Sequence, residues 1–129
     1  MTNPSEHIGR MVDLVRSGEI TVFIRRAHDY EPADLADVLA ALDEEERLQV
    51  VQALPAELSS QALAEMPEEA HAEDTLAALD PARAGEIVEE LDDDDAAGML
   101  RELDPEEQER ILSTVEHRAD VDRLLRYRP

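Results

Sequence analysis

A short internal repeat constrains the fold of this chain more than any other feature. From Glu31 to Val115 the sequence divides into seven units, six of twelve residues and a fourth of thirteen. The last position of each unit is a large apolar residue, and the positions three and four residues earlier are mostly apolar. These positions share one face of an α-helix, whereas a strand would need strict alternation. The repeat therefore predicts one short helix in each unit. The predicted stripe residues are Val38, Leu39, Leu42, Val50, Val51, Leu54, Ala62, Leu63, Met66, Thr75, Leu76, Leu79, Ile87, Val88, Leu91, Met99, Leu100, Leu103, Ile111, Leu112 and Val115.

The first residues of several units are typical of helix starts. Asp80 and Asp104 each precede a proline, which is the pattern of an N-cap followed by the first helical position. Asp43 with Glu46, and Asp104 with Glu107, have the spacing of a capping box. Each helix should be about eight to ten residues long, which is marginal alone in water. Stacking against neighbours buries its stripe, as in a solenoid.

Three less regular helices should flank the repeats. We expect helices over residues 6–16 and 19–28, separated by Ser17-Gly18, and a last one over residues 118–126. The prediction is a single all-α domain over residues 1–129. It comprises two leading helices in 1–30, seven helical units in 31–115 and a C-terminal helix in 116–129.

The charge of the chain limits its partners. Thirty-three acidic residues face twelve basic ones, for a net charge of −21. Nucleic acids and anionic membranes would be repelled, whereas cations or a basic protein surface would be attracted. There is no cysteine, and hence no disulfide or thiolate metal site. No apolar run approaches the roughly 18 residues of a membrane span. The first residues, MTNPSEH, lack the features of a signal peptide.

The sequence carries no strong enzyme signal. The four histidines, His7, His28, His71 and His117, lie far apart and form no HExxH motif. No serine lies in a GxSxG context, and the glycines form no phosphate-binding loop. We therefore expect surface histidines and no catalysis.

Four consecutive aspartates, Asp92 to Asp95, begin the sixth unit. At a helix start they would meet free backbone N–H groups and the positive end of the helix dipole. An EF-hand loop does not fit, because its fifth and ninth positions would be Ala97 and Arg101. Residues 80–110 carry a net charge of −10, and such a face could also hold Mg²⁺ loosely. Helix capping and metal binding both remain open at this point.

The units EPADLADVLAAL, DPARAGEIVEEL and LDDDDAAGMLREL, the SGE break and the ending LLRYRP resemble the N-terminal cytosolic domain of MgtE-type magnesium transporters. The resemblance implies a right-handed superhelix that senses Mg²⁺. In that family, Mg²⁺ ions bind between acidic residues of this domain and of paired CBS domains and hold a closed state. The implied partners are the CBS domains and the transmembrane pore of the same protein. That protein would be a homodimer in the bacterial inner membrane, with the N domain on its cytoplasmic side and monomeric when isolated. A CBS region would then follow Pro129.

The resemblance places the metal-binding positions on Asp94 and Asp95. Two other acidic positions of the family are not acidic in this chain. One falls on Gly98, a turn after Asp94, and the other on Gln61, where Glu57 lies one turn earlier and could compensate. The expected site residues are therefore Asp94 and Asp95, with Mg²⁺ bound weakly and shared with the CBS domains.

An alternative function follows from the repeat alone. A row of short helices can act as a non-catalytic scaffold that binds other helices, as in the superhelix of the flagellar motor switch protein. The two functions would be distinguished by whether CBS domains and membrane segments follow Pro129.

Overall fold

The computed structural model describes residues 4–115 and Leu125. Within this part the chain is helical and contains no strand, so the all-α prediction is confirmed. The predicted helix over residues 118–126 lies outside the described residues apart from Leu125, and the domain limits stay a prediction. The helices are α1 (Pro4–Arg16), α2 (Ile20–Ala27), α3 (Pro32–Ala41), α4 (Glu44–Ala53), α5 (Ala56–Glu65), the 3₁₀ helix η1 (Glu68–Ala70), α6 (Ala72–Ala78), α7 (Pro81–Glu90), α8 (Asp93–Arg101) and α9 (Pro105–Leu112).

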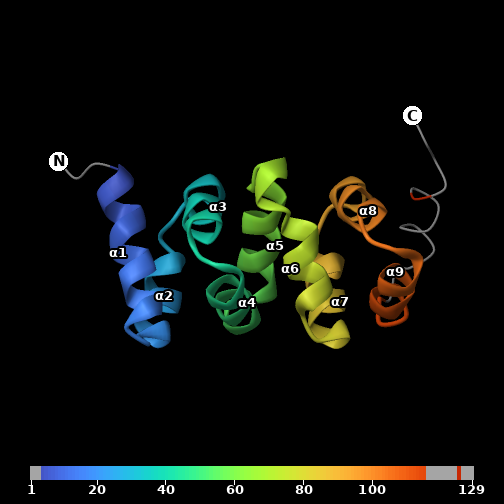
Figure 1. Cartoon of the computed structure of the whole chain (residues 1–129), viewed down its shortest axis with the longest axis horizontal. Coiled ribbons are helices and arrows are strands. Elements are labelled where there is room, and N and C mark those ends of the chain that lie inside the picture. The colour runs from blue at the N-terminus through green and yellow to red at the C-terminus, as the bar shows by residue number, and fades with distance from the viewer. Residues whose placement is uncertain (1–3, 116–124, 126–129) are drawn as a thin grey trace.

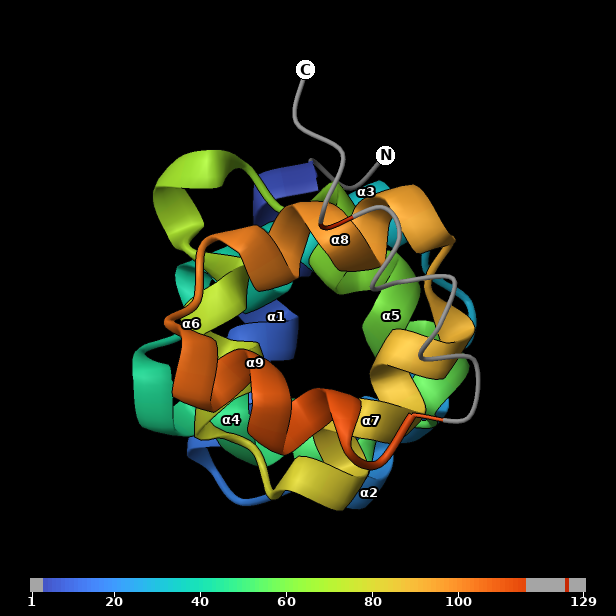
Figure 2. The same ribbon diagram turned by 90° about the vertical axis from the view of Figure 1, so that its right-hand side faces the viewer.

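The helices stack in an elongated row in which each helix packs on the one two places along the chain (Figure 1). The odd-numbered helices α1, α3, α5, α7 and α9 form one continuous series of contacts, and α2, α4, α6 and α8 form a second. Viewed along the row, the helices lie around a common axis (Figure 2). The right-handed sense of a superhelix stays a prediction.

The apolar stripe of the repeat forms the core. Every predicted stripe residue is buried except Met99, which is half-buried. The residue seven positions before each unit's end is buried as well in six of the seven units, because it faces the preceding helix. Phe23, the single phenylalanine, is fully buried between the leading helices and the array. A core of Leu, Val, Ile and Ala thus suffices because the short helices approach one another closely.

Polar side chains inside the array donate hydrogen bonds to carbonyl groups at helix ends. The Arg47 guanidinium, 8% exposed, donates hydrogen bonds to the carbonyl oxygens of Leu39, Leu42 and Ala70. Gln108, at the equivalent position of its unit, donates to the carbonyl of Leu100 at 2.8 Å. The last carbonyls of a helix have no partner within it, so these bonds close each helix against the next one. The sequence analysis did not predict them.

The predicted capping boxes are present at Asp43 with Glu46 and at Asp104 with Glu107. In both, the aspartate accepts a hydrogen bond from the glutamate's backbone N–H, and the glutamate accepts one from the aspartate's N–H. Asp80 lies at the predicted N-cap position of α7, but its side chain makes no capping hydrogen bond to the described residues.

The fourth unit departs from the prediction of one helix of eight to ten residues. Its first part forms η1, and α6 is seven residues long. His71 joins them with φ 53°, a left-handed conformation that is uncommon for a residue other than glycine. The extra residue of this unit explains the difference, since the last eight residues keep the register of the other units and the first five must close the corner differently.

Candidate functional site

The four aspartates lie where the repeat predicted, at the start of α8. Asp92 is the N-cap residue, and Asp93, Asp94 and Asp95 form the first turn. The Asp92 side chain makes no capping hydrogen bond within the described part of the chain. Capping by a side-chain hydrogen bond, which is present at α4 and α9, therefore does not account for this cluster.

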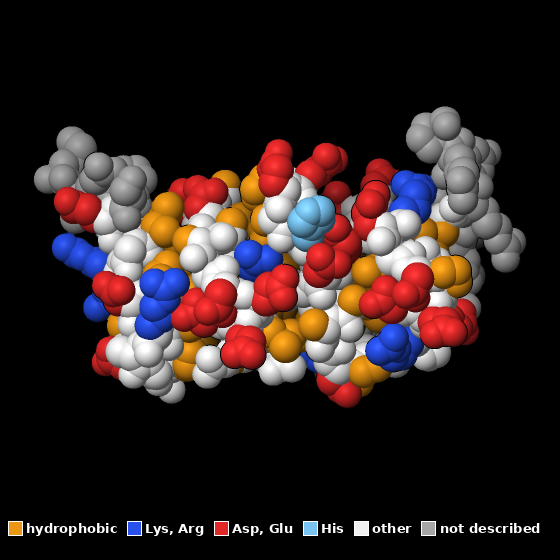
Figure 3. Space-filling model, viewed as in Figure 1, with side chains coloured by type: hydrophobic (Ala, Val, Ile, Leu, Met, Phe, Trp, Pro, Cys, Tyr) orange, Lys and Arg blue, Asp and Glu red, His pale blue; other side chains and the backbone are white. Residues whose placement is uncertain are grey.

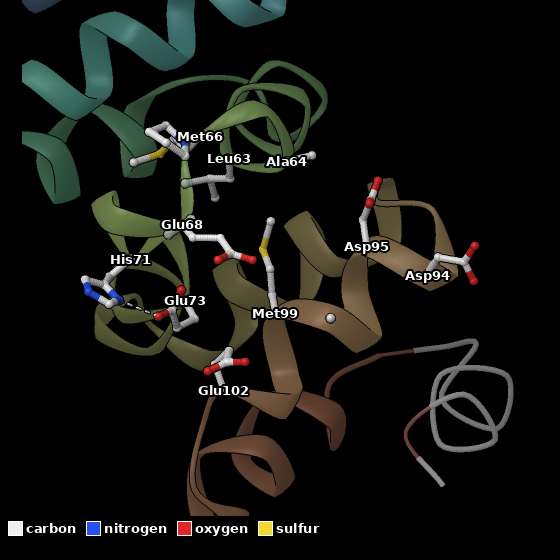
Figure 4. Close-up of a pocket in the computed structure, with 13 residues that line it drawn as sticks. Leu63, Ala64, Met66, Glu68, His71, Glu73, Asp94, Asp95, Met99 and Glu102 are labelled. Carbon is white, nitrogen blue, oxygen red and sulfur yellow. Dashed lines mark hydrogen bonds and ion pairs between the residues drawn. The ribbon is translucent and has the colours of Figure 1, made fainter. Parts of the chain in front are cut away.

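Asp94 and Asp95 are exposed, and neither makes a hydrogen bond or ion pair through its side chain with the described residues. Both carboxylates extend outward from α8 at the rim of the neighbouring hollow, in different directions (Figure 4). They are thus available to a cation or to a partner surface that approaches from outside.

A surface pocket of about 400 Å³ lies between the first turns of α8 and the irregular fourth unit. Asp94, Asp95 and Gly98 line it from α8, and Met99 lies in its middle (Figure 4). On the opposite side lie Glu68, His71 and Glu73, and Glu102 lines the end of the pocket near the C-terminus of α8. Five carboxylates and one imidazole therefore surround one pocket. Its lining residues are Leu63, Ala64, Met66, Pro67, Glu68, His71, Ala72, Glu73, Asp94, Asp95, Gly98, Met99 and Glu102.

A second pocket, of about 290 Å³, adjoins the first at Asp95. Gln61 from α5 and Asp95 from α8 both line it, together with Glu65, Glu90 and Asp92. The structure thus brings together Gln61 and Asp95, which the family resemblance had singled out separately. Glu57 does not line either pocket.

A cluster that the sequence analysis missed lies at the edge of the first pocket. His71, Glu73 and Asp74 can each place one ligand atom within 4.8 Å of the others. The His71 Nδ1 lies 2.9 Å from Glu73 Oε1, and this hydrogen bond, with the nearby negative charges, raises the pKa of His71. Treating His71 as an isolated surface histidine was therefore incomplete. The sequence indicates this cluster only through the extra, thirteenth residue of the fourth unit. That residue removes the first helical turn of the unit and places His71 beside Glu73.

Comparison with known families decides what kind of domain this is. A family model described as the MgtE intracellular N domain matches residues 30–129. The chain belongs to the MgtE N domain family. Helices α1 and α2 precede the matched part. No curated protein matches the sequence.

The fold of this N domain is shared with a solved structure, the "Crystal structure of the soluble part of a magnesium transporter". The TM-score is 0.84 at 19% identity, and the match covers 98% of this chain and 50% of the other. At this identity the likeness shows the fold alone. The chain spans half the length of that soluble part. None of the helices in the described residues of the N domain combines the length and apolarity required to cross a membrane.

The visible face of this N domain is strongly acidic. In Figure 3 carboxylate side chains occur over most of this face, with arginines between them. Two carboxylates on adjacent residues of one helical turn repel each other, and the free-energy cost of this repulsion falls when a cation lies nearby. Oxygen ligands of this type suit hard cations such as Mg²⁺, which retains several waters and uses one or two carboxylates. Asp94 and Asp95 could therefore supply part of an Mg²⁺ site.

Proposed function

We propose that this N domain regulates a magnesium transporter by sensing Mg²⁺ through Asp94 and Asp95. The observation that carries the proposal is the pair of exposed carboxylates without side-chain partners in the described chain, at the start of α8 and beside two acidic pockets. The magnesium transporter in this proposal follows from the chain's membership of the MgtE N domain family. The partners are CBS domains and the pore of the same protein.

The outward direction of the two carboxylates supports a site that is shared between two surfaces (Figure 4). Mg²⁺ requires nearly octahedral coordination and keeps part of its water shell. Two adjacent carboxylates provide a part of such a shell, and an acidic partner surface provides the rest. The isolated N domain therefore binds Mg²⁺ weakly, and binding strengthens when the partner surface is present.

Sensing then follows from charge. With Mg²⁺ bound, the N domain docks on the CBS domains and the closed state is favoured. Without Mg²⁺, the two acidic surfaces repel each other, the N domain separates and the pore opens. This is a two-state equilibrium, which the ion shifts because it binds the docked state more tightly.

The transporter that contains this N domain provides the test. Asp94→Asn with Asp95→Asn should raise the Mg²⁺ concentration for half-maximal closure by about 5- to 150-fold, the range of a typical allosteric coupling. Closure is measured as ion flux in vesicles or as protease protection of the segment after the N domain. The matched control is Glu44→Gln with Glu45→Gln, which removes the same charge from the exposed first turn of α4. An unchanged midpoint in the Asp94 and Asp95 variant would leave these residues with a role in helix stability alone.

A variant that adds a ligand makes the opposite prediction. Gly98 lies one turn after Asp94 and lines the same pocket, and a side chain built there meets no atom within 4 Å. Gly98→Asp should lower the Mg²⁺ concentration needed for closure, because it returns a carboxylate to that turn. Gly98→Asn, which has the same shape without the charge, is the control. Equal midpoints for the two variants would refute a direct role of this surface in ion binding.

A further inference from the structure

A third pocket lies toward the N-terminal end of the molecule. It has a volume of about 280 Å³ and is lined by residues of α1, of the α2–α3 connection and of α3. In the row of Figure 1, α5 lies between α3 and α8, and Pro32 at the start of α3 lines the second pocket together with Asp95. The N-terminal pocket shares no lining residue with the first two pockets. Its lining residues are His7, Ile8, Asp29, Tyr30, Glu31, Asp34 and Asp37.

Apolar and aromatic groups form part of the N-terminal pocket. Ile8 and Tyr30 are half-buried and pack against the hydrophobic core. The rings of His7 and Tyr30 meet edge to face, with centroids 6.4 Å apart, and the Tyr30 hydroxyl donates a hydrogen bond to the His7 carbonyl at 3.5 Å. These contacts fix the aromatic part of the pocket to α1.

Four carboxylates complete the N-terminal pocket, and no arginine lines it. Asp29, Glu31, Asp34 and Asp37 are exposed, and none of them forms an ion pair with the described residues. Elsewhere in the described chain, Arg16 pairs with Glu46 and Arg83 with Glu86. The N-terminal pocket thus combines an apolar wall with an unneutralised charge of −4 when His7 is neutral.

We propose that the N-terminal pocket is a docking site for an arginine side chain of a partner protein. Charge complementarity requires an occupant with a positive charge, because four unpaired carboxylates attract a cation and repel acidic groups. The apolar wall argues for a cation with an apolar stem, which a hydrated metal ion lacks. Arginine fits better than lysine, since its weakly hydrated planar guanidinium stacks on aromatic rings and binds carboxylates through two parallel hydrogen bonds.

The N-terminal pocket combines residues inside and outside the part of the chain that matches the family model. Tyr30, Glu31, Asp34 and Asp37 belong to the part that matches the MgtE N domain, whereas His7 and Ile8 belong to α1, which precedes it. The docking site therefore requires α1 to be packed on α3, a contact that the structure contains.

The test measures binding of two short peptides to the ¹⁵N-labelled chain by NMR. The peptides are acetyl-Ala-Arg-Ala-amide and the same peptide with citrulline, which has the shape of arginine without its charge. We expect the arginine peptide to shift the amide signals of Tyr30, Asp34 and Asp37 in a saturable manner, and the citrulline peptide to leave them unchanged. Equal shifts with both peptides, or shifts spread evenly over the acidic surface, would overturn the proposal.

Variants distinguish binding in the N-terminal pocket from general attraction of the peptide to an acidic protein. Asp34→Asn with Asp37→Asn should weaken binding of the arginine peptide by about tenfold, because two charge-assisted partners are lost. Tyr30→Leu, which keeps the charge, should weaken it by about 2- to 5-fold. The matched control is Asp94→Asn with Asp95→Asn, which removes the same charge from α8, outside this pocket, and should change binding less than about twofold because salt screens charges that do not contact the peptide. Equal losses in the two double variants would show non-specific attraction alone.

A second copy of the chain is the competing occupant, because its own residues 116–129 contain four arginines. Sedimentation equilibrium distinguishes this case. A chain that remains monomeric at the concentrations of the NMR titration supports a separate partner. Concentration-dependent association that disappears with Asp34→Asn and Asp37→Asn would overturn the proposal of a separate partner and indicate self-association.

Discussion

Two glycines inside helices should respond to the same substitution with opposite signs. Gly85 lies in α7 and is buried, whereas Gly98 lies in α8 and is exposed. Replacing a glycine by alanine inside a helix normally stabilises it by about 0.5–1 kcal/mol, because the unfolded chain loses less freedom on folding. Gly98→Ala should show this gain, since no atom lies within 4 Å of the added methyl group.

Gly85→Ala should instead destabilise the domain. The added Cβ would overlap Oγ1 of Thr114 and lie about 3.0 Å from its Cβ, so the end of α9 would have to move away from α7. Thr114 Oγ1 donates a hydrogen bond to the carbonyl of Ile111 at 2.7 Å and also lies 3.2 Å from the carbonyl oxygen of Pro81. Losing these contacts costs about 0.5–1.5 kcal/mol each, and overpacking about 1–3 kcal/mol. After subtracting the helical gain, we expect a net loss of about 1–5 kcal/mol.

Urea unfolding followed by circular dichroism measures both variants against the parent chain, with the slope of the transition as a check on two-state behaviour. The double variant Gly85→Ala with Thr114→Ala should recover part of the loss, because the overlapping oxygen is removed and the 3.0 Å contact with Cβ remains. If Gly85→Ala stabilises the chain as much as Gly98→Ala does, the close packing of α7 and α9 is wrong.

Three further predictions concern the core, a buried arginine and a histidine pair. Leu91→Ala and Leu103→Ala should each lower the free energy of unfolding by about 2–5 kcal/mol, and a loss below about 0.5 kcal/mol would contradict the register. Arg47→Met keeps most of the volume but leaves carbonyl groups at helix ends without donors, so unfolding experiments should show a loss of about 2–4 kcal/mol. The raised pKa of His71, which is due first to its hydrogen bond with Glu73, means that the folded state favours the imidazolium. This stabilisation is therefore present below the ordinary histidine pKa of about 6.5 and is lost as the pH rises through the raised value. In ¹H–¹⁵N NMR titrations, Glu73→Gln should lower the pKa of His71, and an unchanged pKa would show that the pair does not form in solution.

The array was predictable from the sequence because one pattern specifies both the helices and their packing. The stripe residues at the end of each unit are buried because each must cover the next helix, as Leu91 and Leu103 do. The capping boxes at Asp43 and Asp104 were predictable because they depend on four consecutive residues. The hydrogen bonds of Arg47 were not, since they depend on which carbonyl groups a neighbouring helix leaves free.

The surroundings of the candidate site were only partly predictable. Asp94 and Asp95 follow from the repeat, which places them in the first turn of α8, and their selection as metal ligands follows from the family resemblance and stays a prediction. That Gln61 and Asp95 line one pocket depends on how α5 and α8 lie in the array, about three units apart in sequence. The pairing of His71 with Glu73 depends on the left-handed conformation of His71, which only the extra residue of the fourth unit indicates.

The thirteenth residue of the fourth unit explains why an acidic pocket lies between this unit and α8. Counted from its last residue, this unit keeps the register of the others, with Leu76 and Leu79 buried. The other units begin their helices ten residues before the end, as α7 does at Pro81, but α6 begins at Ala72, seven before the end. One helical turn is thus replaced by η1, and the surface that this turn would cover stays open. Met99, the one predicted stripe residue that is not buried, lines this opening together with His71 and Glu73. A shift of register would expose the stripe, so the added residue is accommodated locally. This change opens the first pocket and leaves the carboxylates of α8 at its rim.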